Sequence, residues 1–140
     1  ITGFQETEDG RYLLELRGIC RFNVSEELEL RDGYRRVRPD FTPYHLDLSP
    51  AEEVEIERDR LLSGLKGYFE QQNIGADWDS LIKTPDERLV TTLSMVCPFD
   101  PAEKQVLLEA DDLAQRCKLL IGFVESALRA DNDNGNTALN

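Results

Sequence analysis

Two serine–lysine pairs are the first residues whose types and spacing could perform chemistry. Ser63 precedes Lys66, and Ser80 precedes Lys83, in the Ser-x-x-Lys spacing of hydrolases that use lysine as a base. Such a lysine must be desolvated so that its pKa falls, and other groups must hold the oxyanion. No Ser-Asp-Asn or Lys-Thr-Gly element accompanies either pair. We interpret both as chance matches whose lysines solvate a helix face, and we expect no catalytic residue.

The histidine and cysteine residues do not form the pattern of a metal-binding or cofactor-binding site. The chain has 1 histidine, His45, which cannot form a multi-histidine zinc site, and it has no Gly-rich phosphate loop. Its 3 cysteines, Cys20, Cys97 and Cys117, are an odd number without a Cys-x-x-Cys pair. We expect small, half-buried side chains in a reducing cytoplasm, with no disulfide.

One basic and aromatic cluster has the composition of an RNA-binding surface. Arg35, Arg36 and Arg38 lie between Tyr34 and Phe41, and such residues can contact phosphates and stack on bases. The alternative is an edge strand whose charges block pairing with other strands. The chain holds 16 Lys+Arg against 28 Asp+Glu, for a net charge of −12, and an acidic surface repels polyanions. We therefore favour the edge strand over a nucleic-acid partner.

The elements that would position these residues begin with strands. The 140 residues suit one domain, and no apolar run approaches the roughly 20 residues that cross a bilayer. Apolar and polar residues alternate from 1 to 41, and Asp-Gly pairs at 9–10 and 32–33 are typical of hairpin turns. Gly18 interrupts the pattern, as at a bulge or bend. The alternation predicts antiparallel strands.

Helices are predicted after residue 48 by their start signals. Ser49, Thr84 and Asp100 are each followed by Pro and then, at the third position, by Glu, which is the pattern of a capping box with proline in the first turn. Residues 77–83 indicate a short helix. Asp112 marks a weaker start before apolar residues that are spaced by three and four.

This order of elements predicts an α+β fold. An antiparallel strand meander occupies residues 1–48, a bundle of about four helices occupies 49–130, and 131–140 form a disordered tail. Residues 51–140 hold 9 basic and 18 acidic groups, a net −9, so most of the negative charge belongs to the helical part.

Three stretches of the chain are similar to those of a known family. They are Ile1-Thr2-Gly3-Phe4 with Asp9-Gly10-Arg11-Tyr12, then Leu16-Arg17-Gly18-Ile19-Cys20-Arg21-Phe22, and Pro98-Phe99-Asp100-Pro101-Ala102-Glu103-Lys104-Gln105-Val106-Leu107-Leu108-Glu109. They resemble the Lon protease N-terminal domain, also called the Lon substrate-binding domain. The resemblance covers about residues 1 to 129 and is closest to stand-alone bacterial members.

The resemblance implies a PUA-like pseudo-barrel of strands followed by a helical bundle. Family members begin with a Pro- and Leu-rich segment of further strands, which this chain lacks. We therefore expect an N-terminally truncated domain whose barrel is incomplete, with an open strand edge and an uncovered apolar face.

The resemblance also implies a role in protein quality control, by binding and not by catalysis. In full-length Lon, this domain helps to capture unfolded substrates while separate ATPase and protease domains do the chemistry. We expect contact with unfolded or extended polypeptide through apolar side chains and strand addition. The candidate peptide-binding residues are Tyr34, Phe41, Tyr44 and Leu46, at the junction of strands and helices. The same residues could instead join the two parts of the domain.

Other functions stay open at this stage. The chain could be a subunit or remnant of a protease, or it could bind RNA through a PUA-like surface with Arg35, Arg36 and Arg38. An open strand edge would also let two copies form a homodimer. We expect a protease as a further partner, a cytoplasmic location, and neither a membrane nor a cofactor.

Overall fold

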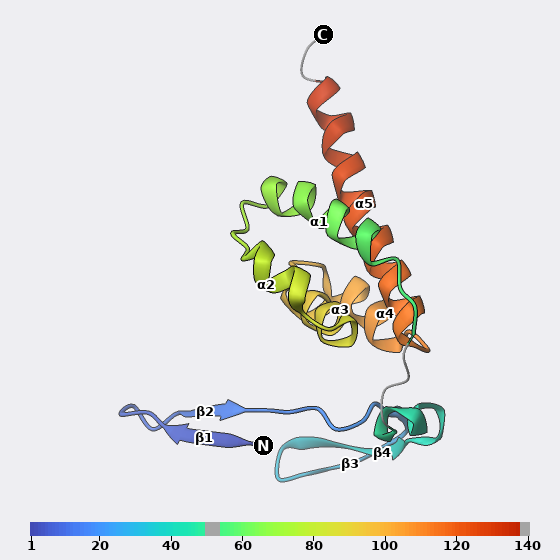
Figure 1. Cartoon of the computed structure of the whole chain (residues 1–140). Coiled ribbons are helices and arrows are strands. Elements are labelled where there is room, and N and C mark those ends of the chain that lie inside the picture. The colour runs from blue at the N-terminus through green and yellow to red at the C-terminus, as the bar shows by residue number, and fades with distance from the viewer. Residues whose placement is uncertain (50–53, 138–140) are drawn as a thin grey trace. The chain divides into compact units, whose positions relative to one another are not determined.

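Four strands followed by helices make up the described part of the chain, residues 1–49 and 54–137, in the computed structural model (Figure 1). Contacts divide the chain into two units, Ile1–Glu52, here called unit 1, and Glu53–Asn140, here called unit 2. The strands lie in unit 1 and the α-helices in unit 2. This order confirms the predicted α+β class.

Unit 1 contains two antiparallel hairpins with Asp-Gly turns. β1 (Gly3–Glu6) pairs with β2 (Tyr12–Glu15), and β3 (Asn23–Arg31) pairs with β4 (Tyr34–Asp40). In the second turn Asp32 has φ of 52° and Gly33 has φ of 83°. Gly adopts this left-handed region freely and Asp tolerates it, which is why this dipeptide suits a tight hairpin. Both turns predicted from the sequence are confirmed.

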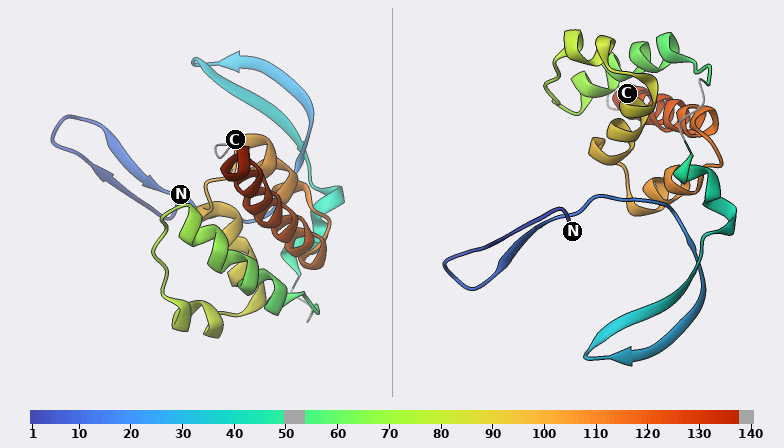
Figure 2. Two further views of the ribbon diagram at one scale, coloured as in Figure 1. Left: turned by 90° about the horizontal axis from the view of Figure 1, so that it is seen from above. Right: turned by 60° about the horizontal axis from the view of Figure 1, so that its bottom comes forward.

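The two hairpins form separate sheets, where the sequence predicted one meander. Figure 2 shows them as distinct ribbons joined by a stretch without strand pairing. In this stretch, residues 16–22, the backbone N–H of Arg21 donates to the Asp47 carboxylate at 2.9 Å instead of to a strand. Among the described residues no strands close into a barrel, and no residue of unit 1 is buried. A short 3₁₀ helix, η1 (Thr42–Leu48), follows β4.

Unit 2 contains five α-helices in its described residues, against the four or so predicted. They are α1 (Arg58–Gln71), α2 (Trp78–Lys83), α3 (Asp86–Val96), α4 (Pro101–Glu109) and α5 (Leu113–Thr137). α5 thus extends past residue 131, where the sequence predicted a tail.

Three helix starts follow the capping rules. The Asp100 carboxylate accepts from the Glu103 N–H at 2.8 Å, and the Glu103 carboxylate accepts from the Asp100 N–H at 2.9 Å, so the predicted capping box is confirmed. Asp112 accepts from the N–H of Gln115 at 2.7 Å before α5. Asp77 accepts from the N–H of Ser80 at 3.2 Å and caps α2.

Of the other two predicted starts, the one at Thr84 is wrong and the one at Ser49 stays a prediction. Pro50, Ala51 and Glu52 of the Ser49 signal lie outside the described residues; α1 begins at Arg58, after residues 54–57, which are not helical. α3 begins at Asp86 with Pro85 as its N-cap, which has no side-chain oxygen to offer. The Thr84 hydroxyl instead donates to the Ser80 carbonyl at 2.7 Å and closes α2.

The apolar core lies within unit 2. α1 runs beside α5 (Figure 2), and two glycines of α1 permit the close approach. A Cβ at Gly64 would lie 3.2 Å from Val124 Cγ1, and one at Gly67 would lie 3.2 Å from Leu128 Cδ2. The buried core residues are Leu61, Leu65, Tyr68, Phe69, Leu89, Val90, Leu93, Cys97, Phe99, Leu107, Cys117, Leu120, Ile121 and Val124.

Replacing Asp100 with alanine is expected to lower the free energy of unfolding by about 1 kcal/mol, because the Glu103 N–H loses its acceptor at the start of α4. Urea denaturation followed by circular dichroism measures the change. Asp100→Ser keeps an oxygen at the cap and should cost only a few tenths of a kcal/mol (about 0.3). Equal losses in the two variants would contradict this role of the cap.

Candidate functional site

The four residues predicted to bind peptide lie in unit 1, but the structure separates one from the others. Phe41 caps η1, and Tyr44 and Leu46 lie within it. Tyr34 begins β4, beside the hairpin turn, where it pairs with Arg31. At about 3.3 Å per strand residue, β4 places Tyr34 about 20 Å from its other end. Phe41, Tyr44 and Leu46 are therefore neighbours, and Tyr34 stands apart.

An ion pair fixes η1 against the chain that precedes β3. Arg21 Nη2 donates to Asp47 Oδ1 at 2.8 Å, and Arg21 Nε donates to Asp47 Oδ2 at 2.9 Å. The two side chains are only 15% and 20% exposed, so solvent screens this two-pronged contact less than a surface pair. Because Asp47 lies in η1, the pair holds the helix in place.

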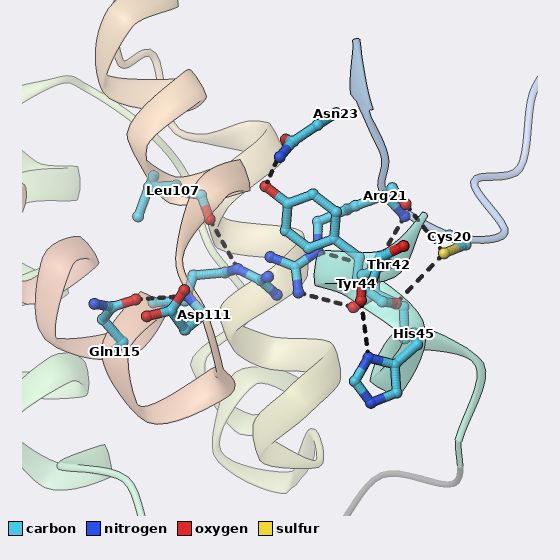
Figure 3. Close-up of polar contacts among 11 residues, drawn as sticks. Cys20, Arg21, Asn23, Thr42, Tyr44, His45, Leu107, Asp111 and Gln115 are labelled. Carbon is cyan, nitrogen blue, oxygen red and sulfur yellow. Dashed lines mark hydrogen bonds and ion pairs between the residues drawn. The ribbon is translucent and has the colours of Figure 1, made fainter. Parts of the chain in front are cut away.

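Tyr44 takes part in this anchoring. Its ring lies under the Arg21 guanidinium, with 4.4 Å between Cζ and the ring centroid. Its hydroxyl donates to Asn23 Oδ1 at 3.3 Å, and its carbonyl accepts a weak hydrogen bond from Cys20 Sγ at 3.5 Å (Figure 3). The half-buried Tyr44 therefore positions η1 and offers little free surface.

Exposed apolar side chains gather at η1. Phe41 is 49% exposed and Leu46 is 70% exposed. The Phe41 ring meets Phe22 edge to face at 5.8 Å between centroids, and Leu48 at the end of η1 is also exposed. We call these four residues, Phe22, Phe41, Leu46 and Leu48, the η1 surface. Sequence reasoning missed Phe22 and Leu48, although the alternation that groups Cys20, Phe22 and Val24 was a signal for Phe22.

The first hairpin carries a second exposed apolar surface. Phe4 pairs with Leu14 across β1 and β2, and the Phe4 and Tyr12 rings lie 6.2 Å apart. All three side chains are exposed, as is Leu13 on the other face. Each sheet has only two strands, so each strand leaves one edge unpaired by another strand of the described chain. Unit 1 therefore offers apolar side chains next to open backbone donors and acceptors.

The basic cluster on β4 is largely neutralised within its own hairpin. Arg35 Nε lies 2.7 Å from Glu27 Oε1, and Arg38 Nε lies 2.9 Å from Glu26 Oε2. The Arg35 guanidinium lowers the pKa of the Glu27 carboxyl, which keeps that carboxylate charged. Arg36 has Leu28 as its cross-strand neighbour. Two of the three arginines are thus paired with glutamates across the hairpin, which favours a charged strand pair over a phosphate-binding surface.

The serine–lysine pairs do not form catalytic dyads in the described residues. Ser80 Oγ donates to the capping carboxylate of Asp77 at 2.6 Å, and Lys83 is exposed. Ser63 is exposed on α1, and Lys66 Nζ lies 5.8 Å from the centroid of the Trp78 ring. Both lysines are exposed to solvent, so neither pair has the desolvated base that the chemistry needs.

The cysteines are free thiols. Cys97 and Cys117 are buried in unit 2, and Cys20 is half-buried in unit 1. Burial raises the pKa of the Cys97 thiol to about 11, and it also raises the pKa of Cys117, so both stay protonated and unreactive at neutral pH. The described residues include no group of three or more acidic, histidine or cysteine side chains that could hold a metal ion. No helix within them is long and apolar enough to cross a membrane.

Comparison with known families identifies one match that covers most of the chain. The family model of the ATP-dependent protease La (LON) substrate-binding domain matches residues 1–126. A search of curated proteins found no match. The family match spans the strands of unit 1 and the helices of unit 2 up to the middle of α5.

Proposed function

Because the chain belongs to the family of ATP-dependent protease La (LON) substrate-binding domains, it is a substrate-binding module, and we propose that its substrate is unfolded or extended polypeptide. Binding takes place on unit 1. Hydrolysis belongs to a separate protease to which the bound chain is passed. Three cysteines without a disulfide support a reducing, cytoplasmic setting for this role.

The single observation that carries the proposal is that none of the described residues of unit 1, 1–49, is buried, while many of its large apolar residues are exposed. Isolated apolar side chains are normal on a surface, but contiguous ones mark interaction sites. Phe41 and Phe22 are in contact on the η1 surface, and Phe4 and Tyr12 are in contact on the first hairpin. Unfolded polypeptide exposes apolar side chains that complement such a surface.

Open strand edges provide the second part of the binding mode. An extended peptide can add to an unpaired edge through main-chain hydrogen bonds, which do not depend on its sequence. The η1 surface then selects apolar side chains. Phe41 and Leu46 are the contacts, Tyr44 positions them through Arg21, and Tyr34 is an additional contact at the tip of the second hairpin.

Binding to an unfolded model protein tests this proposal. A fluorescently labelled, reduced and carboxymethylated protein that cannot refold is titrated with the full chain, at concentrations where sedimentation shows a monomer. Phe41→Ala and Leu46→Ala should each weaken binding about tenfold, because each removes most of a buried apolar side chain from the complex.

Val96→Ala is the matched control, because Val96 is an exposed apolar residue of unit 2. It should leave binding unchanged. Absence of binding by the unaltered chain, or equal losses in all three variants, would contradict a peptide site at η1. A loss of binding on Tyr44→Ala that Tyr44→Phe restores would support the positioning role, because phenylalanine keeps the ring under Arg21.

A further inference from the structure

Unit 2 contains a pocket that the proposed function does not use. It lies between α2 and α3 and has a volume of about 500 Å³, which is within the range of sites for small ligands. The lining residues that set its chemistry are Ser80, Lys83, Arg88, Leu89, Thr92 and Leu93. All of them belong to one continuous stretch of unit 2, so the pocket is complete within that unit.

The floor and the rim of the pocket differ in chemistry. Leu89 and Leu93 are buried core residues that present an apolar floor. Lys83 and Arg88 are exposed on the rim, and neither forms an ion pair with a described residue. The hydroxyl of Thr92 adds a polar group to the rim. The pocket therefore combines apolar area with two cations that are available to an anion.

The surrounding charge makes these two cations unusual. Residues 51–140 carry a net charge of −9, so most of the surface of unit 2 attracts cations and repels anions. The two arginines of α1 are already paired: Arg58 with Asp86, and Arg60 with Glu57 and Glu125. The lining of the pocket thus carries two cations and no carboxylate, on a unit that is acidic as a whole.

The wall of the pocket is held in place before any ligand arrives. Arg58 Nη2 donates to the carbonyls of Ile82 at 2.7 Å and Thr84 at 2.9 Å, with a longer contact to Leu81 at 3.2 Å. Its Nη1 donates to the Asp86 carboxylate at the start of α3. One side chain therefore fixes the corner between α2 and α3. Because this wall is already ordered, ligand binding does not carry the entropy cost of ordering it.

We propose that this pocket binds a short peptide segment in which an aspartate or glutamate adjoins an aliphatic residue. The aliphatic side chain lies on Leu89 and Leu93, and the carboxylate pairs with Lys83 and Arg88. An inorganic anion would leave the apolar floor in water, and a purely apolar segment would leave the two cations unused. The site extends the proposed function by a second contact on unit 2 and depends on no residue of unit 1.

The test uses a peptide that has no charge except one side chain. An N-acetylated, C-amidated pentapeptide with a central aspartate between two leucines is titrated into the ¹⁵N-labelled full chain. Amide shifts should move for the residues of the α2–α3 corner. Replacing the peptide's aspartate with asparagine should weaken binding about tenfold or more, because it removes both ion pairs. Lys83→Ala or Arg88→Ala in the protein should each weaken binding about fivefold, since each removes one partly exposed ion pair. The double variant should lose about tenfold or more.

Lys118→Ala is the matched control, because Lys118 is an exposed lysine of α5 outside the pocket. It should bind the peptide like the unaltered chain. Equal affinity for the aspartate and asparagine peptides, or shifts confined to other residues, would overturn the proposal. Since the pocket variants leave the η1 surface intact, a failure here is distinguishable from a failure of unfolded-protein binding.

Discussion

Replacing Arg58 with alanine is expected to lower the free energy of unfolding of unit 2 by about 3 kcal/mol, because several partners lose their hydrogen bonds at once. The side chain is 25% exposed and serves the carbonyls of Leu81, Ile82 and Thr84 as well as Asp86. Because water can reach part of this corner, the loss in free energy of unfolding is smaller than when a fully buried ion pair is broken. Urea titration followed by Trp78 fluorescence reports on it, since Trp78 begins α2 and lies against Phe69.

Two further variants separate this geometry from charge alone. Arg58→Lys keeps the charge but cannot reach several acceptors with one planar group, so it should recover less than half of the loss. Arg60→Ala is the second variant. Arg60 lies two positions after Arg58 on α1, and its more exposed guanidinium pairs with Glu57 and Glu125. The effect of Arg60→Ala on the free energy of unfolding should be much smaller than that of Arg58→Ala, because solvent screens an exposed ion pair. Full recovery by lysine, or a similar loss at both arginines, would contradict the assignment of Arg58 as the support of the corner.

Replacing Leu120 with alanine is expected to cost about 3 to 4 kcal/mol, the second large effect. Leu120 is 0% exposed on α5 and belongs to the core that α1, α3, α4 and α5 share. Truncation removes buried apolar area and leaves a cavity, because the neighbouring helices are held by the close approach of α1 and α5 at Gly64. Urea denaturation measured by circular dichroism gives the change.

Leu120→Met and Met95→Ala provide the comparison for this core site. Methionine has nearly the volume of leucine, so Leu120→Met should cost less than about 1.5 kcal/mol. Met95 is 69% exposed at the end of α3, and its truncation should cost less than about 0.5 kcal/mol. If Leu120→Ala cost no more than Met95→Ala, the packing of α5 described above would be wrong.

Most of the helical unit could be predicted from the sequence because its signals are local. Asp100 with Glu103, and Asp112 with Gln115, lie within one helical turn, so their hydrogen bonds depend on the adjacent residues alone. Thr84 shows the limit of this reasoning. Its hydroxyl could cap the following helix, α3, or donate to the preceding helix, α2. In the structure it donates to the carbonyl of Ser80 in α2. A choice between competing partners is not visible in the spacing of residues.

The candidate site was harder to predict because it depends on where strands end. Tyr34 and Phe41 are close in the sequence, but β4 separates them by its whole length. The ion pair between Arg21 and Asp47 joins residues 26 positions apart, and no local pattern indicates it. Ser80 and Lys83 were noted for a catalytic spacing that the structure does not support. Both do line the pocket between α2 and α3, where the lysine has a different use.

The unequal distribution of buried residues has a thermodynamic consequence. In the described chain, every buried apolar side chain belongs to unit 2. The heat capacity change of unfolding scales with the apolar area that becomes exposed. The heat capacity change that calorimetry measures for this chain therefore comes mainly from unfolding of the helices, and the strands contribute little to it. Two-stranded hairpins are marginally stable by themselves, and amide hydrogens of β1 to β4 can exchange with solvent through local opening, without passage through the globally unfolded state.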